Sequence, residues 1–363
     1  MRLLTYPDGV NYTVSVIFRA IPLMMMAVCV GYGLYVWNAA DSTGNFVAGR
    51  VVTALGIICL CLFCTAATII RQLIGRYTSF DRFFYPSIGY LAATAAVIYG
   101  TTLFIGATNA EQAREYVAGH VIFGVGLVSG CVATVATAST KFSLIPVNAH
   151  SPENDTQIPS TAFRRSTVLV LSAIPIALAS VAWVVAITNL VLPSTPERFT
   201  VGHVVGGLAM ICTSLIGLVL TILHQVQKSY SPREQLLWPV LVIAMGSLSL
   251  IWGIILLVLH SESYFWTPGF VMIGLGLVCF SILSKVGLLA LVWRRTFPLA
   301  NRVPLLPITT ALACLFLAAF LFQAAVVDSN VFIAAHVLVG LGAICFSLYS
   351  IVSILESGTS SAG

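Results

Sequence analysis

The hydrophobic pattern divides the chain into long apolar runs separated by short polar connections. Residues 168–191 and 305–326, for example, extend for about twenty or more positions without one charged side chain. A helix needs that length to cross a hydrocarbon core of roughly 30 Å. A transmembrane barrel would instead show short segments of alternating hydrophobicity. The pattern therefore predicts an all-α fold, a polytopic membrane helix bundle.

One short motif recurs five times along the chain. The aligned stretches are Phe46–Arg50, Tyr116–His120, Thr200–His203, Thr267–Phe270 and Ile333–His336. We call Gly49, Gly119, Gly202, Gly269 and Ala335 the signature residues and count offsets from them. An apolar run that begins near a proline precedes each motif, and a second apolar run follows it. Each unit therefore consists of a first helix, a short loop and a second helix.

The spacing of the signature residues gives the number of crossings. Successive signature residues lie 66 to 83 positions apart, which fits two membrane crossings and two connections. We predict about ten transmembrane helices in five units, with a polar loop at 142–163 between the second and third. The units cover approximately residues 14–75, 80–141, 165–227, 234–293 and 303–356. Because each unit crosses an even number of times, the repeats are expected to be parallel.

Composition and charge support a membrane protein and give its orientation. The mean hydropathy is +1.00 and only 8% of residues are charged, whereas a soluble domain has about 25%. All lysines and arginines except Arg50, Arg114 and Arg198 lie at the N-terminus, around the connections between units, or toward the inner ends of the second helices. The positive-inside rule then places both termini in the cytoplasm. The net charge of +5 is a topology signal and does not indicate nucleic-acid binding.

Small residues recur on the second helix of each unit. They stand at the signature position and at offsets +5, +7 and +10, so they occupy two faces of the helix. Close backbone approach promotes helix association in lipid. We therefore predict that the second helix is the inner, crowded one. The helix-packing glycines at the signature and +7 positions are Gly49, Gly56, Gly119, Gly126, Gly202, Gly269, Gly276 and Gly342.

Offset +1 carries polar side chains in four of the five units. Arg50, His120, His203 and His336 stand there, and Phe270 takes the place in the fourth unit. We place this offset one residue into the second helix, where the positive end of the helix dipole keeps histidine neutral at pH 7. One hypothesis is an outer-face cluster that responds to acid or faces ions. The other is a repeated structural cap in which interfacial histidines bond to loop carbonyls.

Lys285 is the second unusual polar residue. It lies 16 positions after Gly269, about 24 Å along a helix, while Arg71, Lys141 and His224 lie 22 positions after their signature residues. One interpretation is that its ammonium snorkels toward the inner surface. The other is an intramembrane charge, buried in the bundle, that marks a polar pathway.

Catalytic and cofactor chemistry is not indicated. The nine cysteines all lie in apolar runs, and the spacing of Cys61 and Cys64 fits packing better than a metal or redox pair. Paired carboxylates and metal-spaced histidines are absent from the apolar runs. We expect no enzyme activity, no cofactor and no metal. The expected partners are membrane lipids and a small solute, an ion or a hydrophobic ligand, without nucleic acid.

Three stretches of the chain resemble a known family. Residues 116–126 (YVAGHVIFGVG), 285–307 and 336–356 are similar to the YhiM family of enterobacterial inner-membrane proteins. The resemblance extends over nearly the whole chain. It implies a multi-pass protein of the bacterial inner membrane, without an assigned biochemical activity and loosely linked to coping with acid stress. That family offers no catalytic motif to carry over.

Two functional hypotheses follow. The first is a channel or transporter-like conduit with a role in acid stress, whose outer vestibule lies near Arg50 and the three histidines. The second is a membrane protein that binds a lipid-like or hydrophobic small molecule in an intramembrane cavity and transports nothing. A water-filled path through the bundle would favour the first, and a closed apolar cavity would favour the second.

Overall fold

The computed structural model of this chain is a bundle of long helices. It describes residues 10–73, 76–107, 112–144, 163–192, 195–259, 263–294, 303–326 and 329–360. Most of the predicted polar loop, residues 145–162, lies outside this part. Within it, ten helices are long and apolar enough to cross a membrane. They are α1 (Val10–Ala39), α2 (Thr43–Leu73), α3 (Ser79–Gly106), α4 (Ala113–Ala138), α5 (Arg165–Val191), α6 (Pro196–Val226), α7 (Glu234–Leu259), α8 (Trp266–Arg294), α9 (Leu305–Ala324) and α10 (Asn330–Ser360).

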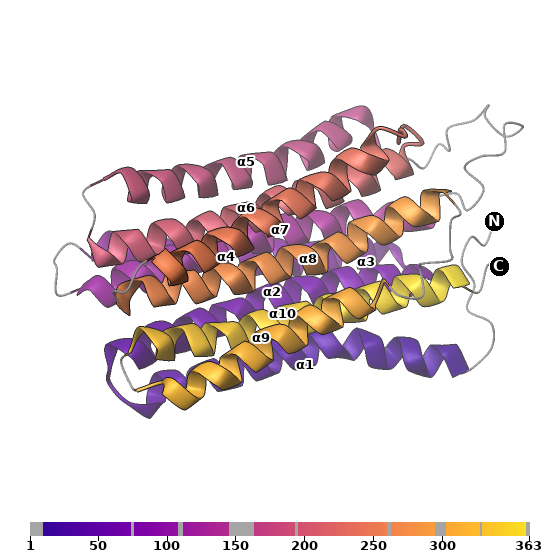
Figure 1. Cartoon of the computed structure of the whole chain (residues 1–363). Helices are drawn as coiled ribbons and strands as arrows, with labels where there is room; N and C mark the ends of the chain where they lie inside the picture. The colour runs from indigo at the N-terminus through magenta and orange to yellow at the C-terminus, as the bar shows by residue number, and fades with distance from the viewer. Residues whose placement is uncertain are drawn as a thin grey trace, which may run out of the picture.

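The even-numbered helices form a closed inner ring. In this ring α2 packs against α4, α4 against α6, α6 against α8, α8 against α10, and α10 back against α2. Each odd-numbered helix lies outside, against the inner helix that follows it in sequence and against the one that precedes it; for α1, the second partner is α10. The helices run along one another, and α1 begins at the same end of the bundle at which α10 finishes (Figure 1).

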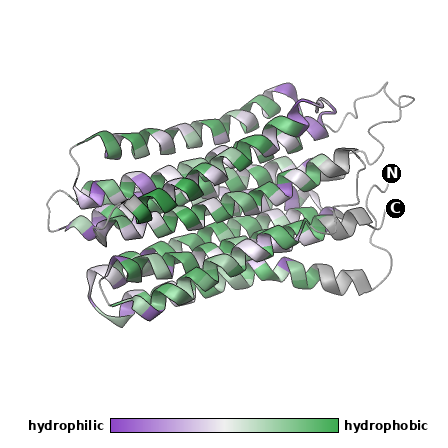
Figure 2. Ribbon diagram, in the orientation of Figure 1, coloured by the Kyte–Doolittle hydropathy of each residue, from purple (hydrophilic) through white to green (hydrophobic). Residues whose placement is uncertain are grey.

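Burial differs sharply between the two layers. Most of each inner helix is buried in the bundle, whereas most of each outer helix faces outward. This burial confirms the prediction that the second helix of each unit is the inner one. Hydrophobic residues cover the middle of the helices, and polar ones gather toward the two ends of the bundle (Figure 2). Such a band is what a hydrocarbon core requires.

Glycines bring each outer helix close to its inner partner. A Cβ added at Gly49 of α2 would lie 2.5 Å from the backbone nitrogen of Trp37 and 2.7 Å from the carbonyl oxygen of Gly33, both on α1. A Cβ added at Gly119 of α4 would lie 2.8 Å from the carbonyl oxygen of Gly100 on α3. Real side chains do not reach such distances, so these contacts require glycine.

A second set of glycines joins neighbouring inner helices. They stand at offset +5, and a Cβ there would meet a Leu Cδ1 at offset +6 of the next unit within 2.5 to 2.7 Å. The four pairs are Gly124 with Leu208, Gly207 with Leu275, Gly274 with Leu341, and Gly340 with Leu55. Between the first and second units the corresponding offsets hold Ala54, which is larger than glycine, and Val125, which is smaller than leucine. The same knob and hole therefore recur around the ring.

The start of the inner helices corrects one prediction. The offset +1 residues are not one residue into the second helix: Arg50, His120 and His203 are each the eighth residue of α2, α4 and α6, and His336 is the seventh of α10. The polar residues before each motif continue the helix instead of forming the loop. Because the helix dipole acts only within the first turn, it cannot be what keeps these histidines neutral.

Candidate functional site

The axis of the inner ring is filled by aliphatic side chains. All five inner helices present Val, Leu or Ile at offsets +2, +6, +9 and +13, and all twenty of these side chains are buried. Offset +2 is valine in every unit: Val51, Val121, Val204, Val271 and Val337. The four layers extend over eleven residues, about 16 Å along the helices. The sequence carried this pattern, but it was hidden among equally apolar lipid-facing positions.

A small cavity remains on this axis. Its volume is about 20 Å³, close to the minimum for one water, and its walls carry no polar group. Its lining comes from all five inner helices: Leu55, Ile58, Leu62, Val128, Val132, Leu208, Ile211, Leu215, Leu275, Val278, Ile282, Leu341, Ile344 and Leu348. A space without polar partners stays dry, so the axis is sealed in this structure.

The three histidines at offset +1 share one local arrangement. Each donates its Nδ1–H to the carbonyl four residues earlier, over 2.8 to 2.9 Å, and each ring lies 4.1 to 4.3 Å from the aromatic side chain at that same residue. The residues concerned are Tyr116 for His120, Phe199 for His203 and Phe332 for His336. A carbonyl can only accept, so Nδ1 carries the proton in each case.

Each histidine has its own aromatic neighbours from other helices. His120 stacks on Phe104 of α3, His203 on Trp252 of α7, and His336 contacts Phe322 of α9 and Tyr32 of α1. No group of three or more His, Cys, Asp or Glu in the described part of the chain could hold a metal ion. The three acceptors are carbonyls of the same helices and not the loop carbonyls that the cap hypothesis expected. The structural cap and the outer vestibule both stay predictions.

Arg50 occupies the same offset but has different partners. Its guanidinium carbon lies 3.8 Å from the ring centre of Phe46, 4.7 Å from that of Trp37 and 5.9 Å from that of Tyr99. Its Nε is buried without a hydrogen-bond acceptor, and none of the ion pairs among the described residues includes Arg50. Cations over aromatic faces are attracted electrostatically, but the guanidinium keeps its donors free.

A pocket opens beside Arg50, between the first two units. Its volume is about 310 Å³, within the range of roughly 300 to 1,000 Å³ that is typical of small-molecule sites. Apart from Arg50, its lining is aromatic, aliphatic or, at Thr53, a hydroxyl: Trp37, Thr53, Ala54, Ile57, Ala95, Ala96, Tyr99 and Ile122. The hydroxyl of Thr53 is already used, since it donates to the carbonyl of Gly49 over 2.8 Å. Arg50 is therefore the one charged group on the pocket wall.

Lys285 lies inside the bundle. Its side chain is 1% exposed, so it is buried and does not snorkel to the inner surface. It stands one turn past Ile282, a residue of the sealed axis. Nearby on α6, Gln225 donates to the carbonyl of Leu289 over 3.1 Å but leaves its own Oε1 without a partner. A buried ammonium is costly unless it is paired and hydrogen-bonded.

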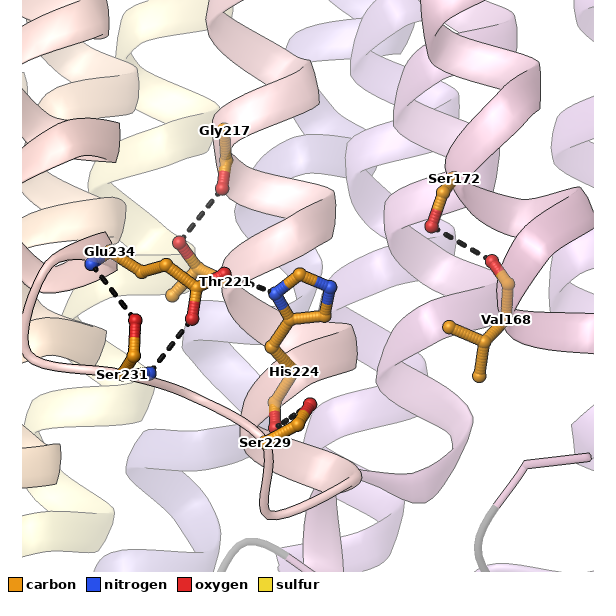
Figure 3. A network of polar contacts seen from close by, with 8 residues as sticks. All are labelled: Val168, Ser172, Gly217, Thr221, His224, Ser229, Ser231 and Glu234. Carbon is orange, nitrogen blue, oxygen red and sulfur yellow. Dashed lines mark hydrogen bonds and ion pairs between the residues drawn. The ribbon is translucent and has the colours of Figure 1, made fainter. Parts of the chain in front are cut away.

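Two units carry matching ion pairs near the C-terminal ends of their second helices. Arg71, at offset +22, pairs with Asp81 at the start of α3, and His224, at the same offset, pairs with Glu234 at the start of α7. Each carboxylate also accepts from the backbone N–H three residues earlier: Asp81 from Thr78 over 2.9 Å, and Glu234 from Ser231 over 2.8 Å, the latter drawn in Figure 3. These pairs tie each inner helix to the outer helix that follows it. The sequence analysis used these basic residues only to measure helix length.

The cysteines form no site. All nine are free and buried in the helices. Cys61 lies close to the carbonyl of Gly89 on α3, at a sulfur–oxygen distance of 3.6 Å, which fits the packing role expected of it.

Comparisons with known proteins give one family and one curated relative. The sequence profile of a family described as "Protein of unknown function (DUF2776)" matches residues 10–360. The inner membrane protein YhiM of Escherichia coli (strain K12) is 45% identical over 349 residues, which cover 96% of this chain and 99% of that protein. This similarity confirms the resemblance predicted from the sequence. No solved structure matches the chain.

Proposed function

The chain belongs to the DUF2776 family and is a multi-pass inner-membrane protein, and on this basis we propose that it binds a lipid-like small molecule in the pocket beside Arg50. The observation that carries the proposal is the contrast between two spaces. The axis leaves about 20 Å³, whereas the pocket offers about 310 Å³. A ligand of ordinary size fits only the second.

The position of the pocket supports entry from the membrane. Trp37 and Tyr99, which line it, are 37% and 42% exposed on the outer surface of the bundle. In a bilayer that surface is covered by lipid, so the pocket opens toward the acyl chains. Transport across the membrane is not part of this proposal, because the sealed axis gives a bound molecule no path to the other side.

The proposal includes an orientation and an internal symmetry. We infer that the chain is built from five parallel two-helix units with both termini in the cytoplasm. The distribution of lysine and arginine supports the orientation. The recurrence of the same glycine and leucine contact between neighbouring inner helices supports the repeat. The pocket beside Arg50 then lies in the outer half of the membrane.

A conduit with a role in acid stress is the alternative. Lys285 favours it, because an ionisable side chain buried within a membrane-spanning helix marks a candidate polar pathway. Lys285→Met should then alter ion flux into liposomes at two outer pH values. Under the binding proposal, wild-type protein gives no flux above empty liposomes at either pH. We also propose that the chain is not an enzyme.

A pocket-filling variant tests the binding function. Ala95 lines the pocket and is exposed, so Ala95→Phe should obstruct it without disturbing the interior. The matched control is Ala177→Phe, at an exposed position on α5. We expect wild-type protein and Ala177→Phe in nanodiscs to bind the neutral fluorescent probe phenylnaphthylamine saturably, and Ala95→Phe to lose that binding. Equal binding by all three proteins would contradict the proposal.

A further inference from the structure

We propose that the occupant of the pocket is a single-chain amphiphile with a carboxylate head, held by Arg50. This inference rests on the proposed binding function and specifies its ligand. The argument uses three features of the site: the free edge of the guanidinium, the length of the apolar wall, and the difference between this unit and the other four.

The free edge of Arg50 fits a carboxylate. The Nε and one terminal nitrogen of a guanidinium form a planar pair of donors that match the two oxygens of a carboxylate. In Arg50 the Nε is buried, has no acceptor, and belongs to a residue on the pocket wall. An anion bound there would remove an unsatisfied buried donor and would neutralise a charge that now has only aromatic neighbours.

The neighbouring arginine does not compete for the same ligand. Arg114 also stacks on Phe46, at 4.7 Å from the ring centre, but it pairs with Asp41 over 3.2 Å and with Glu115 over 3.0 Å. Its charge is therefore balanced by two carboxylates of the chain itself. Arg50 lacks such a partner in the described part of the chain, which makes it the group on this surface that can accept an external anion.

The apolar wall fits one alkyl chain below the head. Arg50 lies one residue after the signature glycine and 21 residues before Arg71 at the inner end of α2, so it stands near the outer boundary of the hydrocarbon core. The wall continues to Ile57, seven residues or about 10 Å deeper. A head at Arg50 with its tail toward Ile57 would have the orientation of a lipid in the outer leaflet. The narrow volume favours one chain over two.

The other units lack this combination. At offset +1 they carry His120, His203, Phe270 and His336, and each histidine packs in its own aromatic setting. Only the first unit presents a permanent cation there. Small residues beside it, Ala54, Ala95 and Ala96, leave the room that the pocket occupies. The site is thus a departure from the repeat, confined to one of five equivalent places.

The test measures quenching of tryptophan fluorescence by brominated ligands. Full-length protein in nanodiscs of neutral phosphatidylcholine is titrated with dodecanoic acid brominated next to its carboxylate, and with the corresponding brominated dodecanol. A bromine near the head group would lie beside Trp37, so Trp37→Phe should abolish the saturable part of the signal. We expect the acid to quench saturably and the alcohol to need at least about tenfold more ligand, since a charge-assisted pair is lost.

Variants of Arg50 distinguish the contribution of the carboxylate head from that of the alkyl chain. Arg50→Met should raise the half-saturating concentration of the acid at least about tenfold and leave that of the alcohol unchanged. Arg50→Lys should recover part of the affinity, because lysine keeps the charge but not the paired donors. The matched control is Arg198→Met, which removes an arginine on the same side of the membrane, outside the pocket lining.

The possible outcomes distinguish a wrong ligand assignment from a wrong binding function. If acid and alcohol bind equally and Arg50→Met changes neither, the carboxylate assignment is wrong while the binding function stands. If neither ligand quenches saturably, both fail. Nanodiscs doped with phosphatidylglycerol test a third outcome. We expect the acid to keep its saturable signal there, and its loss at a small fraction of that lipid would identify a two-chain phospholipid as the occupant.

Discussion

At the axis, five inner helices meet with the same aliphatic side chains at the same four offsets, and the space between them nearly vanishes. Beside Arg50, two of these helices and their outer partners leave about 310 Å³ open to the lipid side. The two regions differ in whether their residues are the same in all five units. Offsets +2, +6, +9 and +13 are large and apolar in all units. Offset +1 and the nearby outer-helix residues vary between units.

This comparison separates structural positions from functional ones. Residues that repeat in every unit build the ring, and a departure from the repeat marks a place where packing alone does not determine the residue. Arg50 is such a departure, and Lys285 is another, since its four counterparts are Thr65, Val135, Leu218 and Ile351. Predictions can therefore be ordered by how strongly each change should disturb the ring or the pocket.

The largest effect is expected from a charge on the axis. Ile211→Asp would place a carboxylate in a dry space of about 20 Å³ without a polar partner, at a cost of several kcal/mol. We expect the variant to yield no folded protein by size-exclusion chromatography in detergent, whereas Ile211→Leu should fold normally. A folded Ile211→Asp protein that conducts ions would mean that the axis can be hydrated, and the contrast with the pocket would disappear.

Truncations on the two surfaces should differ in cost. Leu208→Ala removes a buried side chain that also fills the space above Gly124, so we expect a loss of about 2–5 kcal/mol in the free energy of unfolding. Ile57→Ala enlarges a pocket that is already open and should lose only about 1 kcal/mol. Unfolding in denaturing detergent, followed by circular dichroism, measures both. Equal losses would show that the pocket wall is as tightly supported as the axis.

Removal of the buried amine should have a smaller effect, of opposite sign. Lys285→Met replaces a buried ammonium by an apolar side chain of similar length, which should leave stability unchanged or raise it by about 1 kcal/mol. The melting temperature of the purified protein tests this, with Ile282→Met on the same helix as a control for methionine itself. A clear fall in the melting temperature would mean that Lys285 is held by a stabilising interaction in the native protein.

The smallest effect is expected from the three histidines. Replacing His120, His203 and His336 together by Gln should leave binding of the brominated acid unchanged, because their contacts are with aromatic residues away from the pocket lining. Comparison of this variant with Arg50→Met, at the same offset, isolates the role of the arginine. A loss of binding in the histidine variant would instead support one shared outer site. An altered pH dependence of this binding would support the hypothesis that the histidines respond to acid.

Much of the architecture could be predicted from the sequence. The length of the apolar runs gave ten helices, and the small residues on two faces of the second helix indicated an inner layer. The closed ring was not predicted, because an apolar residue facing the axis and one facing lipid look the same in a sequence. The starts of the inner helices were placed too late, since the polar residues before each motif were assigned to loops.

Only part of the candidate site could be predicted from the sequence. Arg50 stood out as a charge in an apolar context, but the sequence grouped it with three histidines that the structure distributes among separate aromatic neighbours. The pocket depends on Ala95 and Ala96 of α3, which come close to Arg50 only through packing between units. Burial of Lys285 likewise could not be read from its distance along the helix, because a long side chain can turn toward the surface or the interior.

The central claim is that a ligand occupies the side pocket and not the axis. The most direct measurement is photo-crosslinking of the full-length protein in membranes with a dodecanoic acid that carries a diazirine on its chain, followed by peptide mass spectrometry. We predict adducts on residues 50–57 of α2 and 95–99 of α3, reduced in Ala95→Phe and unchanged in Ala177→Phe. Adducts on the axis residues 208–215 and 275–282, or spread evenly over the outer helices, would contradict the claim.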